Sequence, residues 1–183
     1  MRGVVTDSGE VFRLGTAKAE ENLEFRRYLS AHNVDEKPFQ VIAGEVQKQI
    51  DCTNCANCCR CSVVPVGSRE IGRIAAHLGV TPEAACRAYT VPDPEAPARR
   101  TLKSSREGCV FLAGNLCRIY TVRPAACREF PHVAVGSHTL GGRQSSHGRW
   151  AALCPIIYNA IEAYKHVTGF HPGHAAGKRA GQH

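Results

Sequence analysis

Five cysteines fall within ten consecutive positions of this chain, in the segment CTNCANCCRC at residues 52–61. So dense a set of thiols is typical either of disulfides or of a metal site. The N-terminal sequence MRGVVTDSGEVFRLGTAK lacks the long apolar segment of a secretory signal, so we expect a cytoplasmic protein whose thiols stay reduced. The clustered spacing therefore favours metal binding. Five more cysteines follow along the chain, namely Cys86, Cys109, Cys117, Cys127 and Cys154.

The first three cysteines, Cys52, Cys55 and Cys58, follow the spacing C-x2-C-x2-C. This spacing lets one tight loop direct three sulfurs at a single centre, and it matches the first three ligands of a bacterial ferredoxin cluster. The ferredoxin pattern would place a fourth cysteine at residue 62, which is Ser62. Zinc sites also use C-x2-C pairs, so zinc stays an alternative. We favour an iron–sulfur cluster because zinc rarely needs a third closely spaced thiolate.

The adjacent pair Cys58 and Cys59 bears on the number of centres. In an extended backbone neighbouring side chains point to opposite sides, so two consecutive thiolates do not easily bind one tetrahedral ion. Cys154 precedes a proline, as the remote ferredoxin ligand does. We therefore predict two metal centres, with a single centre as the alternative. One centre would use Cys52, Cys55, Cys58 and Cys154, and the other Cys59, Cys109, Cys117 and Cys127.

Hydrophobic periodicity predicts a small, mostly α protein with helices before and after the cysteine cluster. Residues 91–108 hold several prolines and predict a loop, and short extended segments are expected within residues 110–120. We expect an N-terminal helical extension at residues 1–50, an irregular, metal-stabilised cysteine-cluster domain at 51–168 and a flexible tail at 169–183. The predicted helices cover residues 21–32, 37–50, 68–79, 81–89 and 153–164.

The formal net charge of +7 raises the question of a nucleic-acid partner. The densest basic run lies between Arg99 and Arg106, in the proline-rich segment, and no aromatic residue there could stack on a base. Bound thiolates would also offset part of the positive charge. We therefore expect no nucleic-acid partner, although a basic nucleic-acid-associated zinc domain is a further alternative. No apolar run reaches the roughly 18 residues of a membrane span, so we expect no membrane contact, whereas a protein partner is compatible with the sequence.

The segments CTNCANCC and CVFLAGNLCRIYTVRPAACREFP resemble the CxxCxxCC family of zinc- or iron-chelating proteins, often called YkgJ-like cysteine cluster proteins. The resemblance covers about residues 50–155. It implies metal binding through cysteines, and Cys154-Pro155-Ile156 stands where the family commonly has C-P-G. Because the family includes flagellin lysine N-methylases, the resemblance also implies an alternative, a metal-dependent enzyme that modifies proteins.

Three residues of the second cysteine block are candidates for contacts around the metal. Arg123 and Arg128 could hydrogen-bond cluster sulfurs and offset their charge, or they could pair with Glu129 or a helix C-terminus. Tyr120 is expected to supply packing around the site. Cys61 and Cys86 fall outside the pattern, and the sequence identifies no catalytic residue.

Overall fold

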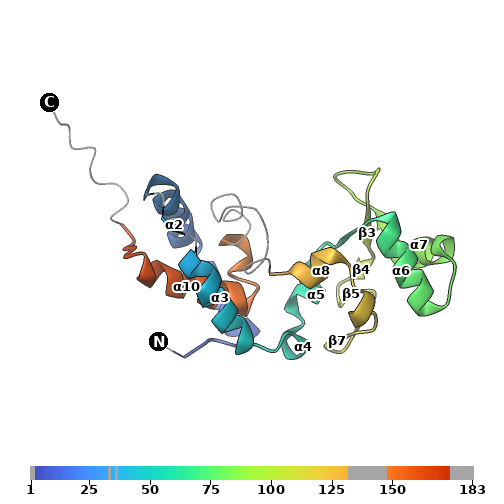
Figure 1. The fold of residues 1–183 in the computed structure, drawn as a ribbon, viewed down its shortest axis with the longest axis horizontal. Coiled ribbons are helices and arrows are strands. Elements are labelled where there is room, and N and C mark those ends of the chain that lie inside the picture. Colours follow the sequence, from blue (N-terminus) through green and yellow to red (C-terminus); the bar gives the residue numbers. More distant parts are fainter. Residues whose placement is uncertain (1–2, 33, 36, 132–147, 174–183) are drawn as a thin grey trace. The chain divides into compact units, whose positions relative to one another are not determined.

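The structure is a computed structural model that describes residues 3–32, 34–35, 37–131 and 148–173. The chain divides into two compact units, which Figure 1 shows together. Residues Met1–Asp51 and Pro131–His183 form the first, called here the helical unit. Residues Cys52–Phe130 form the second, called here the cysteine unit. Within the described part of the chain, no helix is both long enough and apolar enough to cross a membrane.

The helical unit is built from α1 (Ser8–Ala17), α2 (Ala19–His32), α3 (Lys37–Lys48) and α10 (Pro155–Val167). Helix α10 packs against α3 and α1 and is apolar on most of its surface. Burying these apolar faces is what holds short helices together, because isolated helices of this length are marginal in water. The core side chains are Val11, Phe25, Leu29, Phe39, Ala43, Val46, Ile156, Ile157, Ala160, Ile161, Tyr164 and Phe170.

Hydrogen bonds tie the connecting segments of the helical unit to this core. The Tyr164 hydroxyl donates to the Asp35 carbonyl at 2.6 Å. The Asn159 side chain accepts from the Val5 backbone N–H at 3.0 Å and donates to the Val5 carbonyl at 2.8 Å. Each bond satisfies a backbone group outside a helix, and together they fix the N-terminal segment and the α2–α3 connection.

The cysteine unit contains short elements in a different arrangement. Its two longest helices are α6 (Ser68–Leu78) and α7 (Pro82–Tyr89), and its strands pair antiparallel in the order β1-β3-β2, with separate pairs β4-β5 and β6-β7. In the three-stranded sheet Pro65 is opposite Thr101 and Thr90 is opposite Leu102. The helical turns are α4 (Cys52–Cys55), α5 (Asn57–Cys61), the 3-10 helix η1 (Tyr120–Val122) and α8 (Ala125–Glu129). The strands are β1 (Pro65–Val66), β2 (Thr90–Pro92), β3 (Arg100–Leu102), β4 (Ser104–Ser105), β5 (Gly108–Cys109), β6 (Leu112–Ala113) and β7 (Leu116–Cys117).

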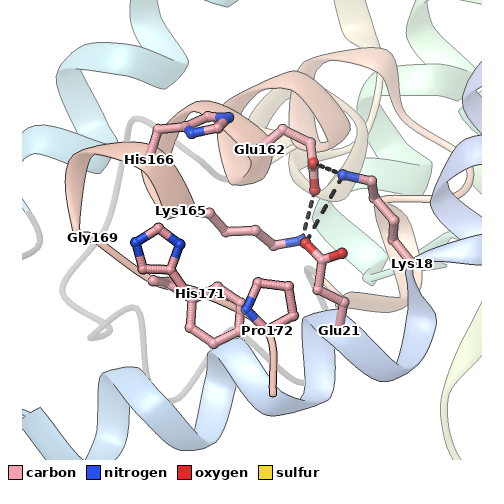
Figure 2. A pocket seen from close by; sticks show the side chains of 9 residues that line it. Lys18, Glu21, Glu162, Lys165, His166, Gly169, His171 and Pro172 are labelled. Atoms are coloured by element: carbon pink, nitrogen blue, oxygen red, sulfur yellow. Dashed lines mark hydrogen bonds and ion pairs between the residues drawn. The ribbon is translucent and has the colours of Figure 1, made fainter. Parts of the chain in front are cut away.

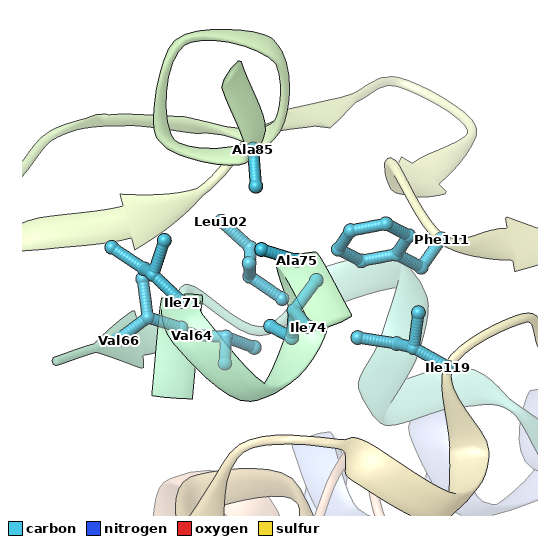
Figure 3. Packing of buried hydrophobic residues seen from close by; sticks show 9 residues of the cluster. All are labelled: Val64, Val66, Ile71, Ile74, Ala75, Ala85, Leu102, Phe111 and Ile119. Atoms are coloured by element: carbon cyan, nitrogen blue, oxygen red, sulfur yellow. The ribbon is translucent and has the colours of Figure 1, made fainter. Parts of the chain in front are cut away.

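A hydrophobic cluster between α6, α7 and the strands forms the core of the cysteine unit (Figure 3). Its members range from Val64 to Ile119 and come mainly from β1, α6, α7 and β3, so it joins segments that are far apart in the sequence. Cys109, Cys117 and Cys127 are partly buried against it. The cluster comprises Val64, Val66, Ile71, Ile74, Ala75, Ala85, Leu102, Phe111 and Ile119.

The predicted mostly α fold with short extended segments is confirmed. The expected loop at residues 91–108 is wrong in part, because this stretch contains the end of β2 together with β3, β4 and the first residue of β5. Tertiary pairing explains the difference: Thr101 and Leu102 of β3 are buried between β1 and β2.

The predicted domain boundaries stay a prediction, because compact units defined by contacts are not a test of independent folding. Helix α10, which was assigned to the cysteine-cluster domain, belongs to the helical unit. The predicted tail begins at residue 169, and Phe170 within it is buried, with its ring 5.0 Å from that of Phe25. The rest of that tail, residues 174–183, lies outside the described residues.

Candidate metal centre

The first cysteine block consists of two helical turns joined by a residue in a left-handed conformation. Helix α4 ends at Cys55, Ala56 has a φ of 47°, and α5 begins at Asn57. Cys58 and Cys59 therefore lie in a helix, where successive side chains diverge by about 100°. The extended backbone assumed in the sequence argument for two centres is thus wrong, and adjacent thiols here can lie on one side of the chain.

Four thiols from different elements lie in one neighbourhood. Cys59 is on α5, Cys109 ends β5, Cys117 ends β7 and Cys127 is on α8. Burial raises the pKa of Cys109, Cys117 and Cys127, the last to about 12, and the charge of Cys59 raises each of them further. The charges of Cys109 and Cys117 likewise raise the pKa of Cys127. These mutual effects place the four sulfurs within electrostatic range of one another.

Cys59 differs from the other three thiols in its surroundings. A hydrogen bond with the Cys58 side chain lowers the pKa of Cys59 to about 6 against the opposing effect of burial. The guanidinium groups of Arg123 and Arg60 lower it further. A thiolate is the form of cysteine that binds metal, so Cys59 is the thiol of this group best prepared to act as the first ligand.

Backbone N–H groups already point at two of the sulfurs. The N–H of Phe111 hydrogen-bonds Cys109, and the N–H of Ile119 hydrogen-bonds Cys117, and each bond lowers the pKa of its thiol. In both cases the donor lies two residues after the cysteine, at corresponding positions after β5 and β7. Such bonds stabilise the charged thiolate, and hydrogen bonds to the ligands are a normal part of a cysteine metal site.

The cations expected around the site have different surroundings. The Arg123 guanidinium lies 3.9 Å from the centre of the Tyr120 ring, and its charge lowers the pKa of Cys59, Cys117 and Cys127. The Tyr120 side chain is half exposed, so it supports Arg123 more than it covers the sulfurs.

Arg128 is turned toward the backbone. It donates from Nη1 to the Arg123 carbonyl at 2.7 Å, and its charge acts on Glu70. Of the two arginines, Arg123 is therefore the one whose charge acts on the thiols.

Arg60, between the last two cysteines of CCRC, is a functional candidate that the sequence analysis missed. Its guanidinium donates to the Cys55 carbonyl at 3.3 Å, to the Gly114 carbonyl at 3.1 Å and to Asn115 Oδ1 at 2.6 Å. Asn115 in turn donates to the Asn54 carbonyl at 2.9 Å. These contacts join the first cysteine block to the β6–β7 turn, which leads directly to Cys117. The sequence features that could have indicated this role are the position of Arg60 between two cysteines and the presence of Asn115 at the β6–β7 turn.

A glycine allows α5 and β5 to approach closely. Gly108 has a φ of +120°, and a Cβ atom there would lie 2.9 Å from the Cys59 carbonyl oxygen and 3.0 Å from Arg60 Cα. Only glycine fits both the backbone conformation and the space. This contact brings Cys109 to the turn that carries Cys59.

The remaining cysteines are placed as follows. Cys58 contacts Cys59, whereas the Cys61 thiol donates to the Asn57 carbonyl at 3.0 Å. Cys154 precedes α10 in the helical unit and is buried there. The predicted first centre needs Cys154 to meet Cys52, Cys55 and Cys58, which belong to the other unit, so this allocation stays a prediction. Cys86 packs against the hydrophobic cluster, with its sulfur 3.6 Å from Thr90 Oγ1.

The donor chemistry of the four gathered thiols fits a thiolate centre. Their sulfurs are partly buried, two of them accept backbone N–H bonds, and three arginines, Arg60, Arg118 and Arg123, offset their charge. Among the described residues, however, no three His, Cys, Asp or Glu side chains converge closely enough to hold a metal ion. Loading would therefore require these four sulfurs to move closer together.

Comparison with known proteins gives one match. A family model described as "CxxCxxCC: Putative zinc- or iron-chelating domain" matches residues 51–155. This range contains all ten cysteines of the chain. No curated protein and no solved structure matches the chain.

Proposed function

The chain belongs to the CxxCxxCC family of zinc- or iron-chelating domains, and we propose that Cys59, Cys109, Cys117 and Cys127 hold its metal centre. The observation that carries the proposal is the pair of equivalent N–H···S hydrogen bonds, from Phe111 to Cys109 and from Ile119 to Cys117. A thiol that only fills space in a core has no need of a donor two residues later, whereas a thiolate ligand is stabilised by one.

The surrounding charges support the same assignment. Four thiolates on Zn²⁺, or on a [4Fe–4S] core of charge +2, leave a net charge of −2. Arg60 and Arg123 act on Cys59 from two different segments and would offset this charge. We assign Arg123 the role of electrostatic partner of the centre, held by Tyr120, and Arg60 the role of fixing the first cysteine block to the β6–β7 turn.

For the bound species we propose an iron–sulfur cluster in preference to zinc. The support comes from the neighbouring first cysteine block and not from the four ligands themselves: Cys52, Cys55 and Cys58 have the C-x2-C-x2-C spacing of a ferredoxin cluster, which supplies more closely spaced thiols than a zinc site uses. The function is then that of a binding module whose centre stabilises the fold or supplies electrons or metal to a partner protein. A protein-modifying activity stays an alternative that rests on the family resemblance alone.

Purification without oxygen tests the bound species. We expect a brown protein with the broad visible absorption at about 400 nm that thiolate-bound iron–sulfur clusters give. The protein should contain iron and acid-labile sulfide in equal amounts. A colourless protein that contains zinc and no sulfide would replace the cluster with a tetrathiolate zinc site. A protein that contains neither metal after expression in iron- and zinc-supplemented medium would refute the proposal.

Single Cys→Ser variants test the ligand assignment. We expect Cys59→Ser, Cys109→Ser, Cys117→Ser and Cys127→Ser to lose the same centre, whereas Cys61→Ser and Cys86→Ser retain it. Cys61→Ser is the matched control for Cys59→Ser, because both thiols lie on α5 and the Cys61 thiol donates a hydrogen bond to the Asn57 carbonyl. Cys58→Ser distinguishes one centre from two: a different residual spectrum from that of Cys59→Ser indicates a second centre.

A further inference from the structure

The helical unit contains a pocket of about 240 Å³ that no cysteine lines. Figure 2 shows it between the Lys18–Glu21 segment, the last turns of α10 and the chain that follows α10. Its volume is the share of roughly eight water molecules in the liquid, which suits a small metabolite. The lining residues are Lys18, Glu21, Glu162, Lys165, His166, Gly169, Phe170, His171 and Pro172.

Two lysines and two glutamates form a connected ion-pair network on one side of the pocket, drawn with dashed lines in Figure 2. Lys165 Nζ donates to Glu21 Oε1 at 2.6 Å and to Glu162 Oε1 at 2.7 Å, and its side chain is only 5% exposed. Lys18 Nζ pairs with Glu162 Oε2 and lies 3.9 Å from Glu21 Oε1. The four formal charges therefore cancel.

Stability alone does not account for this network. Only Lys165 in this network is buried, and the side chains of Lys18, Glu21 and Glu162 are 32%, 25% and 20% exposed. Partly exposed ion pairs add little stability, and removing the charge of Lys165 from water is costly. The neighbouring core of the helical unit is filled with such apolar residues, Phe25, Ile161 and Tyr164 among them. Charges that line a pocket beside an apolar core are better explained by ligand recognition.

The charge balance of the pocket defines the class of ligand. A simple anion would meet the carboxylates and a simple cation would meet the ammonium groups, so neither gains from a network of zero net charge. Some hydrogen-bonding capacity nevertheless remains. Within the described residues, Lys165 uses two of its three N–H donors and Glu21 Oε2 accepts no hydrogen bond. One donor and one acceptor side by side suit a molecule that carries both a carboxylate and an ammonium group.

We propose that this pocket binds a free amino acid, whose carboxylate accepts from Lys165 and whose ammonium group donates to Glu21. The side chain of the amino acid then lies against Phe170 and Pro172, the apolar members of the lining. The residues of this site all belong to the helical unit, whereas the four proposed metal ligands belong to the cysteine unit.

Calorimetric titration of the full-length, metal-loaded protein with each standard amino acid in turn tests the proposal. We expect at least one to bind with a dissociation constant of about 1 mM or lower. For the amino acid that binds most tightly, the amine that lacks its carboxylate and the acid that lacks its ammonium group should each bind at least about tenfold more weakly. Absence of binding at concentrations up to about 10 mM, or equal binding of either analogue, would overturn the proposal.

Two variants place the binding in this pocket. Glu21→Gln keeps the size of the side chain and removes its charge, and Lys165→Met keeps most of the apolar stem and removes the ammonium group. We expect each to weaken binding at least about tenfold. Lys48→Gln is the matched control, because Lys48 forms an exposed ion pair with Glu45 at 2.7 Å in the same unit and should bind as the parent protein does. If Lys165→Met does not fold, Glu21→Gln decides, and unchanged binding by a folded Glu21→Gln protein would refute the assignment.

Discussion

The two units of this protein are held together by different means. The helical unit buries long side chains in a continuous core, with the Tyr164 ring 5.8 Å from that of Phe25 and 5.4 Å from that of Phe39. In the cysteine unit the described strands have two or three residues each, and the hydrophobic cluster contains a single aromatic residue, Phe111. Short strands contribute few ladder hydrogen bonds, so the second unit needs an additional source of stability. From this comparison we expect core packing to sustain the helical unit and the proposed metal centre to sustain the cysteine unit.

Removing the metal should reveal the difference in stability between the two units most clearly. We expect a chelated, reduced protein to lose amide-exchange protection across residues 52–130, because metal binding supplies on the order of 10 kcal/mol to the folding of such small sites. Helices α2, α3 and α10 should keep their protection. Hydrogen exchange followed by mass spectrometry measures both units in one sample. Retained protection in residues 52–130 would show that the hydrophobic cluster is sufficient without metal.

The next largest effect is expected at the close approach between α5 and β5. Gly108→Ala should destabilise the cysteine unit by about 3 kcal/mol and lower its metal content, because the added Cβ meets backbone atoms at 2.9 and 3.0 Å and φ is +120°. Gly114→Ala is the control: its φ is +61°, and nothing lies within 4 Å of the added atom. It should cost only about 1 kcal/mol of backbone strain and keep the metal. Denaturant unfolding and metal analysis of both variants check this, and equal effects would contradict it.

A corresponding substitution in the helical unit should leave the metal unaffected. A Cβ at Gly15 would lie 2.5 Å from Ala152 Cα and 2.6 Å from the Ala151 carbonyl oxygen. We expect Gly15→Ala to destabilise the helical unit by about 2 kcal/mol through overpacking, with unchanged metal content. Gly44→Ala in α3 has open space around it and should stabilise by about 0.5–1 kcal/mol. Loss of metal from Gly15→Ala would mean that the two units do not fold independently.

The smallest expected effect concerns a carboxylate of the cysteine unit. Glu70 accepts hydrogen bonds from the N–H groups of Gly67 at 2.9 Å and Ala125 at 2.8 Å, and so joins α6 to the start of α8. Burial raises the pKa of Glu70, but these bonds and the charges of Arg73 and Arg128 outweigh it, so the pKa is lowered overall.

Because the folded state has the lower pKa, the contribution of Glu70 is complete above its unfolded value of about 4.3 and is lost as pH falls through the folded value. Glu70→Gln should therefore cost about 1 kcal/mol at neutral pH, and the difference from the parent protein should shrink below about pH 4. Urea unfolding across this range measures it. Glu83→Gln, on the exposed start of α7, is the control and should leave the free energy of unfolding at neutral pH unchanged.

The sequence predicts the long helices better than the irregular parts, and the reason is physical. Helices α2, α3, α6, α7 and α10 carry apolar residues at helical spacing, which is a local signal. Helix α1 was not predicted, because it buries only Val11 and Gly15 and so lacks an apolar stripe. Strand β3 was not predicted either, since its burial depends on partners that lie 8 or more residues away in the sequence.

The candidate site shows the same division. The cysteine pattern indicates which residues are candidate metal ligands, but not which of them lie close together in the fold. The grouping of Cys59 with Cys109, Cys117 and Cys127 depends on the Gly108 contact and on the bonds of Arg60 to the β6–β7 turn. Neither of these contacts can be recognised from the spacing of cysteines in the sequence. The inference about adjacent cysteines failed in its premise because α5 is helical, and the allocation of the ligands to two centres stays a prediction.

Cys109, Cys117 and Cys127 pack against the hydrophobic cluster, so apolar packing and metal binding can each order the same part of the chain. Bringing Cys59 to Cys127 closes a loop of roughly seventy residues, and a cross-link of that size offsets roughly 4 kcal/mol of chain entropy. Apolar collapse and metal binding close the same loop, so whichever occurs first lowers the entropy that the other must overcome. Loss of a buried methyl group from Ile74 or Ile119 would therefore weaken metal binding with every thiol intact. Conversely, a rich metal supply would allow the chain to tolerate losses in this core that it could not tolerate when metal is scarce.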